Sequence, residues 1–174
     1  MLTFEGHAII TADGMIADGA GEYPPALRND ADWAQYQRAL DAAALVVTGR
    51  RGHERHPNPG RNRLVLTRSV ECLARDPKDP RATLWNPVAL PLRDVVAELG
   101  VHDGIIAITG VFEMFVADYT SFLLSESNRL LLPGGTPCFS FGHPRTILGH
   151  AGLRPVSTEL IDAEAMVTTT LWTR

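Results

Sequence analysis

Residues 48–69, TGRRGHERHPNPGRNRLVLTRS, indicate the fold of this chain more clearly than any other stretch. They hold six of the fifteen arginines of a protein whose net charge is −4. An apolar run, residues 44–48, leads into Gly49 and Arg50, and a second apolar run, residues 64–66, follows. The pattern predicts a strand, a turn, a helix start and a strand, and phosphate binds well at a helix start. We therefore expect a site for a small polyanion here, the alternative being a solvated basic loop.

On both sides of this stretch, apolar runs alternate with helical patterns. Asn29 or Asp30 can cap a helix in which Trp33, Tyr36 and Leu40 follow helical spacing. The strands expected in the first two thirds of the chain are residues 7–11, 44–48, 64–67, 82–85 and 104–109. Further expected features are a mobile loop at 15–25, a turn-rich connection at 75–81, a helix at 92–99 and a helix start after Gly110.

The C-terminal third changes character and is rich in strand patterns. The expected strands are residues 122–124, 129–132, 153–160 and 165–172. Alternating β and α elements followed by a β-rich segment predict an α/β fold with three layers, α/β/α. Its central sheet would be mostly parallel, with an antiparallel hairpin at the C-terminus. The order suits a doubly wound nucleotide-binding sheet, but neither GxGxxG nor GxxxxGK[ST] is present, which argues against the Rossmann and P-loop classes.

Length and composition limit the possible classes of protein. The 174 residues suit a single domain, 1–174, and no apolar run is long enough to span a membrane. The N-terminus lacks a signal-peptide pattern and the two cysteines form no framework, so we expect a cytoplasmic protein. The net charge of −4 argues against nucleic acid as a partner. His53 and His56 lie three apart without further ligands to complete a set, so no metal site is expected.

Short motifs along nearly the whole chain carry a resemblance to a known family. In order, they are Asp13-Gly14-Met15-Ile16, an acidic residue before Trp33, Thr48-Gly49-Arg50-Arg51, Pro57-Asn58-Pro59-Gly60-Arg61, Leu66-Thr67-Arg68-Ser69, Ile108-Thr109-Gly110 and Leu132-Pro133-Gly134-Gly135-Thr136-Pro137-Cys138-Phe139. Each motif is weak alone, and their order and spacing together are moderately specific. The chain resembles the dihydrofolate reductase-like superfamily, which also contains the reductase domain of bacterial riboflavin biosynthesis.

This resemblance implies NADPH as the cofactor. Two arginine-bearing strand ends facing one crevice suit a dinucleotide phosphate, and a guanidinium donates two hydrogen bonds to a phosphate group. By the resemblance, the phosphates would meet Arg50, Arg51 and Gly52 after Gly49, with Thr109 and Gly110 on the other side. The 2′-phosphate would be held by Thr67, Arg68 and Ser69. The nicotinamide would be lined by Ala8 and Ile9 and covered by Ile16.

Two residues are candidates for contact with the substrate. The resemblance implies that Asp32, a carboxylate on the first helix, hydrogen-bonds a pteridine or pyrimidine ring and helps its protonation as hydride arrives. A carboxyl group in a partly apolar pocket can have a raised pKa, which suits this role. The alternative is that Asp30 and Asp32 only favour the helix start. Arg61 matches the position where folate reductases bind a substrate carboxylate, or it is a surface arginine.

Two departures from the family pattern bear on the substrate and on activity. Folate reductases carry a Pro-Trp pair where this chain has Tyr23-Pro24-Pro25, and the family favours two adjacent glycines where it has Thr109-Gly110. We expect an NADPH-dependent oxidoreductase acting on a pterin or aminopyrimidine. The 5-amino-6-(5-phosphoribosylamino)uracil reductase type is favoured over dihydrofolate reductase. The alternative is a catalytically silent nucleotide-binding or dimeric interaction protein. Riboflavin-type relatives suggest a homodimer.

Overall fold

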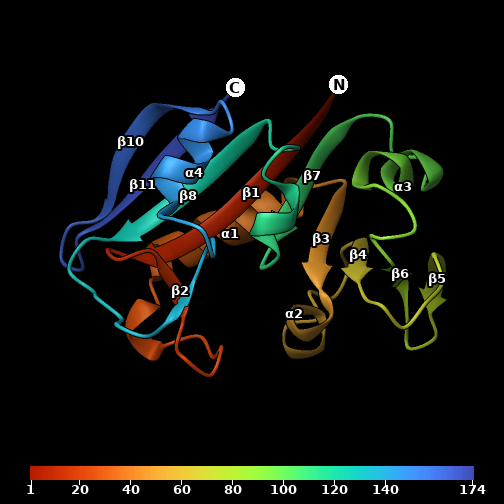
Figure 1. The fold of residues 1–174 in the computed structure, drawn as a ribbon, viewed down its shortest axis with the longest axis horizontal. Coiled ribbons are helices and arrows are strands. Elements are labelled where there is room, and N and C mark those ends of the chain that lie inside the picture. Colours follow the sequence, from red (N-terminus) through yellow and green to blue (C-terminus); the bar gives the residue numbers. More distant parts are fainter. The chain divides into compact units, whose positions relative to one another are not determined.

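The computed structural model describes residues 1–174, and Figure 1 labels most of its helices and strands. The chain divides into two compact units. Unit 1 contains Met1–Phe4 and Ala39–Val111, and unit 2 contains Glu5–Arg38 and Phe112–Arg174. Strand β1 (Leu2–Thr11) and helix α1 (Asp30–Ala42) each have residues in both units. A single domain over the whole length stays a prediction.

Unit 1 is built on parallel strands in the order β7-β3-β4-β6, with β5 added antiparallel to β6. Its elements are β3 (Leu45–Gly49), α2 (Arg50–Arg55), β4 (Arg63–Leu66), β5 (Leu73–Asp76), β6 (Asp79–Trp85), α3 (Leu92–Glu98) and β7 (Gly104–Thr109). All of β4 and all but the last residue of β3 are buried. Continuous burial is typical of parallel strands that are covered on both faces, which explains their unbroken apolar runs.

The register of these strands brings three carboxyl ends level with one another. Thr48 of β3 lies opposite Thr109 of β7, and Gly49 lies opposite Leu66 of β4. Parallel strands whose ends are aligned present the loops that follow them at one edge of the sheet. The residues after Gly49, Leu66 and Thr109 are therefore neighbours.

Unit 2 has strands in the order β10-β11-β8-β1, in which only β8 and β1 are parallel. Its elements besides β1 and α1 are β2 (Met15–Ala17), the 3-10 helices η1 (Pro25–Leu27) and η2 (Phe112–Phe115), β8 (Ser121–Ser127), β9 (Thr136–Pro137), α4 (Pro144–His150), β10 (Arg154–Asp162) and β11 (Val167–Thr173). Tyr119 and Phe139 pack their rings against Phe122, and all three are buried. The predicted α/β fold, mostly parallel with an antiparallel C-terminal hairpin, is confirmed.

Asn29 fixes the start of α1. Its side-chain Oδ1 accepts a hydrogen bond from the backbone N–H of Asp32 at 3.0 Å, which satisfies one of the amides that a helix start leaves without a partner. Its Nδ2 donates to Oδ2 of Asp162, at the end of β10, at 2.7 Å. The predicted cap is therefore Asn29, and one buried amide also ties α1 to the C-terminal hairpin.

The Pro-Gly-Gly motif packs against the loop that follows β1. Strand β9 pairs with β2, and the backbone N–H groups of Ala12 and Cys138 complete the contact through the carbonyls of Leu130 and Gly14. Asp13 accepts the N–H of Leu132 at 3.1 Å. These bonds explain why both segments carry short, turn-rich motifs.

Gly135 is required by this close approach. A Cβ at this position would lie 2.7 Å from the carbonyl oxygen of Ala17 and 3.0 Å from that of Leu132. We expect Gly135→Ala to lower the free energy of unfolding by about 1–3 kcal/mol, because backbone atoms must move to make room. Gly149→Ala in α4 is the matched control, since nothing lies within 4 Å of its added Cβ. Thermal melts that show equal losses for both variants would contradict the contact.

Five details of the structure differ from what the sequence predicted. Residues 129–132 are not a strand, because their backbone bonds go to the loop after β1 rather than to a neighbouring strand. The turn-rich connection 75–81 lies instead in the β5–β6 hairpin. Helix α4 begins at a proline, Pro144, after a turn and was missed. The helix expected after Gly110 is a single 3-10 turn, η2, and the loop 15–25 contains β2.

Candidate functional site

The carboxyl end of β3 leads directly into helix α2 in unit 1. Gly49 is the N-cap and Arg50 the first helical residue. Gly52 lies so close to the end of β3 that a Cβ there would be 2.8 Å from Oγ1 of Thr48. Arg50 and Arg51 are both exposed at this helix start. Oε1 of Glu54 accepts from Nε of Arg50 at 2.9 Å, in an ion pair whose side chains are both more than half exposed.

A second turn follows β4 at the same edge. The hydroxyls of Thr67 and Ser69 are 2.9 Å apart, and Oγ1 of Thr67 also accepts the backbone N–H of Ser69 at 3.1 Å. The two hydroxyls are thereby held side by side. Arg68 between them is exposed, and its guanidinium has no hydrogen bond or ion pair in the structure. The turn therefore presents a free cation flanked by two hydroxyls.

The carboxyl end of β7 completes this edge of unit 1. Thr109 is buried and its Oγ1 donates to the carbonyl of Val47 at 3.4 Å. Gly110 is exposed with φ of +70°, a backbone conformation that favours glycine. The structure thus brings nine of the predicted cofactor residues together at one edge: Gly49, Arg50, Arg51, Gly52, Thr67, Arg68, Ser69, Thr109 and Gly110.

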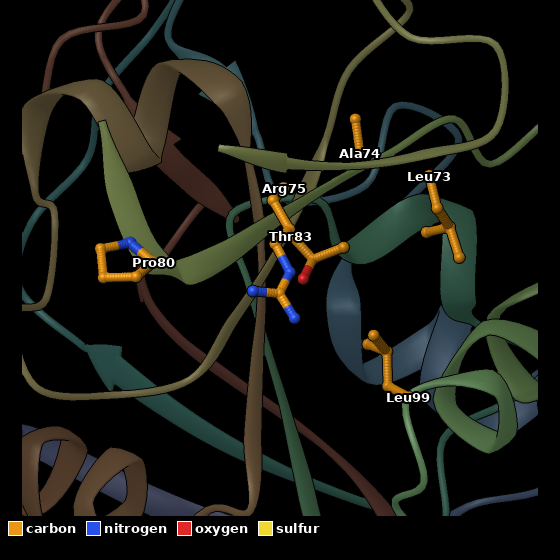
Figure 2. Close-up of a pocket in the computed structure, with 6 residues that line it drawn as sticks. All are labelled: Leu73, Ala74, Arg75, Pro80, Thr83 and Leu99. Carbon is orange, nitrogen blue, oxygen red and sulfur yellow. The ribbon is translucent and has the colours of Figure 1, made fainter. Parts of the chain in front are cut away.

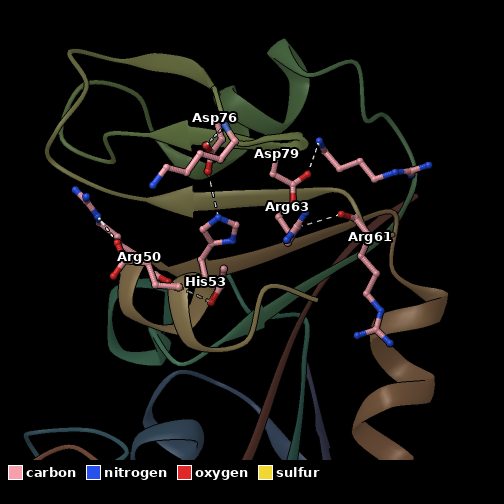
Figure 3. Close-up of polar contacts among 11 residues, drawn as sticks. Arg50, His53, Arg61, Arg63, Asp76 and Asp79 are labelled. Atoms are coloured by element: carbon pink, nitrogen blue, oxygen red, sulfur yellow. Dashed lines mark hydrogen bonds and ion pairs between the residues drawn. The ribbon is translucent and has the colours of Figure 1, made fainter. Parts of the chain in front are cut away.

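The remaining arginines of the motif have structural partners (Figure 3). Arg61 precedes β4, at the opposite end from Thr67, and its guanidinium is bonded to Oδ1 of Asp41 at 2.6 Å and 3.0 Å. Arg63 is 1% exposed and pairs with Asp79. These contacts hold unit 1 together, and Arg61 is not brought to the edge where the cofactor residues lie.

His53, on α2, pairs with a carboxylate of the β5–β6 hairpin (Figure 3). Its Nε2 lies 3.2 Å from Oδ2 of Asp76. The backbone N–H of Lys78 is the largest influence that lowers the pKa of Asp76, and the hydrogen bond from His53 adds to it. No group of three or more His, Cys, Asp or Glu side chains is arranged to hold a metal. The histidine therefore has a structural contact that links α2 to the hairpin.

Unit 1 also has two hollows, and neither is lined by a predicted site residue. The larger, of about 400 Å³, is lined by Leu73, Ala74, Arg75, Pro80, Thr83 and Leu99 (Figure 2). The smaller, of about 160 Å³, shares Pro80, Thr83 and Leu99 with it and extends to the start of β4. Both lie along the edge hairpin, away from the carboxyl ends of β3, β4 and β7. They do not mark the candidate site.

Asp32 lies in unit 2, in the first turn of α1, with its carboxyl group largely buried. Burial raises the pKa of this carboxyl above its usual range, and a hydrogen bond with Ser125 and the charge of His7 oppose the rise. Ser125 is itself buried, and its Oγ lies 2.7 Å from Oγ1 of Thr169. A carboxyl group with a raised pKa can hold a proton closer to neutral pH than a solvated one, so this side chain can act as a general acid.

Sequence reasoning missed several polar groups of unit 2, among them His7, whose charge acts on Asp32. His7 is 5% exposed, its Nε2 lies 2.7 Å from Oε1 of Glu5, and Oγ of Ser121 donates to Oε2 of Glu5 at 3.0 Å. Burial raises the pKa of the Tyr23 phenol to about 12, and the charge of Asp32 adds to this rise. In the sequence, the indication for these groups was that Glu5 and His7 are two residues apart and so share one face of β1. This spacing becomes informative only once the strand is known to be buried.

The residues predicted to line the nicotinamide also lie in unit 2. Ala8 and Ile9 are half-buried on β1, where they lie opposite Leu124 and Ser125 of β8. Ile9 is therefore level with the serine that bonds Asp32. Ile16 is half-buried on β2, which pairs with β9. No helix of the structure has the length and apolar character needed to cross a membrane.

Comparison with known proteins identifies the fold. The structure resembles a Shewanella sp. PV-4 protein named for riboflavin biosynthesis, with a TM-score of 0.70, 16% identity and coverage of 99% of this chain and 98% of that chain. It also resembles dihydrofolate reductase from Enterococcus faecalis complexed with NADP(H). That match has a TM-score of 0.68 and 15% identity, and it covers 99% of this chain and 96% of that chain. No protein-family model and no curated protein matches the sequence.

Two longer proteins of known structure show the same likeness over part of their length. The chain matches the deaminase/5-amino-6-(5-phosphoribosylamino)uracil reductase from Thermotoga maritima with a TM-score of 0.65 and 13% identity, covering 98% of this chain and 56% of that chain. The match with Acinetobacter baumannii RibD has a TM-score of 0.70 and 12% identity, and it covers 99% of this chain and 58% of that chain. At these identities the likeness concerns the fold, and the predicted dihydrofolate reductase-like fold is confirmed.

Proposed function

We propose that this chain is an NADPH-dependent oxidoreductase that transfers hydride to a pterin-type or pyrimidine-type substrate. The observation that carries the proposal is Asp32, a largely buried carboxyl with a raised pKa, held beside Ser125 in the first turn of α1. A carboxylate that only favoured a helix start would gain nothing from burial, since the helix dipole acts at exposed positions too. Desolvation without a full set of partners is costly and is typical of functional sites.

Asp32 can serve the substrate in either protonation state. The ionised carboxylate accepts hydrogen bonds from a ring N–H and an exocyclic amino group, as found together in pterins and aminopyrimidines. The protonated carboxyl can donate a proton to a ring nitrogen as the adjacent carbon is reduced. Ser125 donates to the ionised form, and Thr169 can donate in turn to Ser125, so both states have partners.

The carboxyl ends of β3, β4 and β7 form one edge of unit 1, the strand-end edge, and its residues fit the phosphates of NADPH. Arg68 with Thr67 and Ser69 offers a free guanidinium and two hydroxyls for the 2′-phosphate. Arg50, Arg51 and the N–H of Gly52 would hold the pyrophosphate with Thr109 and Gly110. Replacing Glu54 by a phosphate as the partner of Arg50 would cost only about 1 kcal/mol, because the Arg50–Glu54 ion pair is exposed. In unit 2, Ala8, Ile9 and Ile16 would line the nicotinamide. When bound, NADPH would supply the hydride.

Within this class we favour a 5-amino-6-(5-phosphoribosylamino)uracil reductase type of activity over dihydrofolate reductase. The folate-type Pro-Trp pair is absent, and the solved structures that the chain resembles include riboflavin-pathway reductases. Arg61 stays a proposed contact for the anionic part of the substrate. Such an anion would have to exchange with Asp41, whose side chain is 68% exposed and so can move away into solvent. A homodimer and a cytoplasmic location also stay proposals.

Two measurements test this function. NADPH titration is expected to change the tryptophan fluorescence and raise the melting temperature, because a ligand that binds only the folded state stabilises it. Loss of NADPH absorbance is then followed with dihydrofolate and with 5-amino-6-(5-phosphoribosylamino)uracil, of which the second is expected to be reduced. No response to NADPH would exclude the cofactor. Binding without reduction of either substrate would favour a catalytically silent nucleotide-binding protein of the same fold.

A further inference from the structure

Helix α2 carries two of the arginines proposed to hold the cofactor, but it is too short to fix its own orientation. It has six residues, and none of them is fully buried. Helices of this length are marginal on their own and depend on contacts with the rest of the fold. Gly52 and His53 are the only partly buried residues of α2, and Gly52 has no side chain. His53 is therefore the α2 side chain that is set most deeply into unit 1.

Asp76 of the β5–β6 hairpin holds the ring of His53 (Figure 3). Nε2 of His53 lies 3.2 Å from Oδ2 of Asp76, and the two side chains are each only 12% exposed. An ionised carboxylate only accepts, so Nε2 donates this hydrogen bond. The other ring nitrogen, Nδ1, is buried and has no hydrogen-bond partner. One hydrogen bond thus fixes the direction in which the ring points.

The hairpin holds this carboxylate in place with its own backbone. Oδ1 of Asp76 accepts the N–H of Lys78 at 2.8 Å, which leaves Oδ2 for α2. The same N–H is the largest influence that lowers the pKa of Asp76, so the carboxyl group is ionised at neutral pH. Asp79 repeats the arrangement, because its Oδ1 accepts the N–H of Arg81 at 2.9 Å and its Oδ2 pairs with the buried Arg63. Two carboxylates therefore join the hairpin to α2 and to β4.

We propose that His53 and Asp76 are positioning residues for the cofactor site. Their contact holds α2 in the orientation in which Arg50 and Arg51 reach the pyrophosphate of a dinucleotide. Binding groups that are already in place lose less freedom when a ligand arrives, which raises affinity. The inference rests on the proposed binding of NADPH. It adds that the β5–β6 hairpin, which carries none of the proposed cofactor residues, contributes to the affinity of the site.

The position of α2 matters only for ligands that reach α2. NADPH and NADH share the pyrophosphate, whereas adenosine 2′-phosphate lacks it and would meet only the turn around Arg68. Loss of the contact between His53 and Asp76 should therefore weaken both dinucleotides equally and leave the binding of adenosine 2′-phosphate unchanged. Arg68→Gln should give the opposite pattern, weakening NADPH and adenosine 2′-phosphate but not NADH. A general loss of structure would weaken all three ligands alike.

His53→Asn and His53→Gln form a matched pair for this test. The amide nitrogen of glutamine can take the place of Nε2 and donate to Asp76, whereas that of asparagine lies near the place of Nδ1, which has no partner. In His53→Asn we expect the Kd of NADPH and that of NADH to rise about 5- to 10-fold in a fluorescence titration, as for the loss of one hydrogen bond. His53→Gln should restore most of the affinity. His56→Asn, at an exposed position directly after α2, is the control and should change nothing.

A double-mutant cycle checks that Asp76 acts through His53. Asp76→Ala should raise the same two Kd values as His53→Asn, and the double variant should raise them no further, because the contact can be lost only once. Additive increases in the double variant would mean that the two residues act separately, and they would overturn the proposal. If His53→Asn does not fold, Asp76→Ala carries the same comparison of the three ligands.

A measurement without nucleotide separates this proposal from the proposed function. The N–H of His56 donates to the carbonyl of Gly52 at 2.8 Å, so its hydrogen exchange reports whether α2 stays formed. This exchange should become faster in His53→Asn. If the wild-type protein binds neither dinucleotide, the proposed function fails and a cofactor role for His53 fails with it, even where the exchange shows that His53 holds α2. If the wild type binds NADPH and a folded His53→Asn binds it equally well, the positioning role is refuted and the function stands.

Discussion

Replacing Asp32 by asparagine is expected to lower kcat by about 10²- to 10⁴-fold, since asparagine keeps the size of the side chain but cannot transfer a proton. NADPH affinity should stay unchanged, because Asp32 is not among the residues proposed to hold the cofactor. The measurement is NADPH oxidation with whichever of the two substrates is reduced, together with a fluorescence titration of the cofactor. A variant that keeps more than half of the wild-type kcat would remove Asp32 from the catalytic step.

The same variant has a distinct effect on stability. Burial raises the pKa of Asp32, so the folded state favours the protonated carboxyl. The wild-type protein therefore loses this contribution to stability as the pH rises through the raised pKa, and Asp32→Asn does not. We expect a higher melting temperature for Asp32→Asn than for wild type at neutral pH. Asp30→Asn, at an exposed position in the same helix turn, should instead lower it slightly and leave kcat intact.

Replacing Arg68 by glutamine is expected to raise the Kd for NADPH about 10- to 100-fold. Hydrogen bonds to a charged partner contribute about 1.5–3 kcal/mol, and the Arg68 guanidinium has no other partner from which binding would have to free it. NADH affinity should stay the same, because NADH lacks the 2′-phosphate. Fluorescence titration with both nucleotides makes the comparison.

A matched control separates this effect from a general loss of positive charge. Arg81 is also exposed in unit 1, and its side chain has no ion pair, but it lies on β6 away from the strand-end edge. Arg81→Gln should leave both affinities unchanged. If the two substitutions weakened NADPH binding equally, the affinity would depend on the overall positive charge, and no specific 2′-phosphate site would exist at Arg68.

Unbroken apolar runs were sufficient to predict the strands whose residues are mostly buried. The strands at 44–48, 64–67 and 104–109 were expected within one residue of their observed limits, because parallel strands with both faces covered have unbroken apolar runs. The helix start after Asn29 was also predictable from its cap. The order of these elements was enough to predict a mostly parallel α/β sheet, and the short motifs carried the resemblance that implied the dihydrofolate reductase-like fold.

Elements whose hydrogen bonds go to distant segments could not be predicted in the same way. Residues 129–132 have the composition of a strand, but the side chain of Asp13 accepts the N–H of Leu132 and the backbone N–H of Ala12 donates to the carbonyl of Leu130. In the candidate site, the roles of His7 and Ser125 depend on the parallel pairing of β1 with β8, which a local pattern does not reveal. The sequence pattern assigned Arg68 and not Arg63 to the phosphate site, but it did not reveal that Arg63 is buried.

The Asn29 side chain limits which changes of sequence and length the C-terminal hairpin can accept. One amide group both caps the helix that carries Asp32 and donates to Asp162, 133 residues further along the chain. The turn of the C-terminal hairpin is thereby part of the support of the proposed proton donor, although it lies far from it in sequence. Insertions or deletions in that turn are therefore constrained by chemistry as well as by packing. We expect residues added to the hairpin after Asp162 to be tolerated more readily than any change that moves the Asp162 carboxylate.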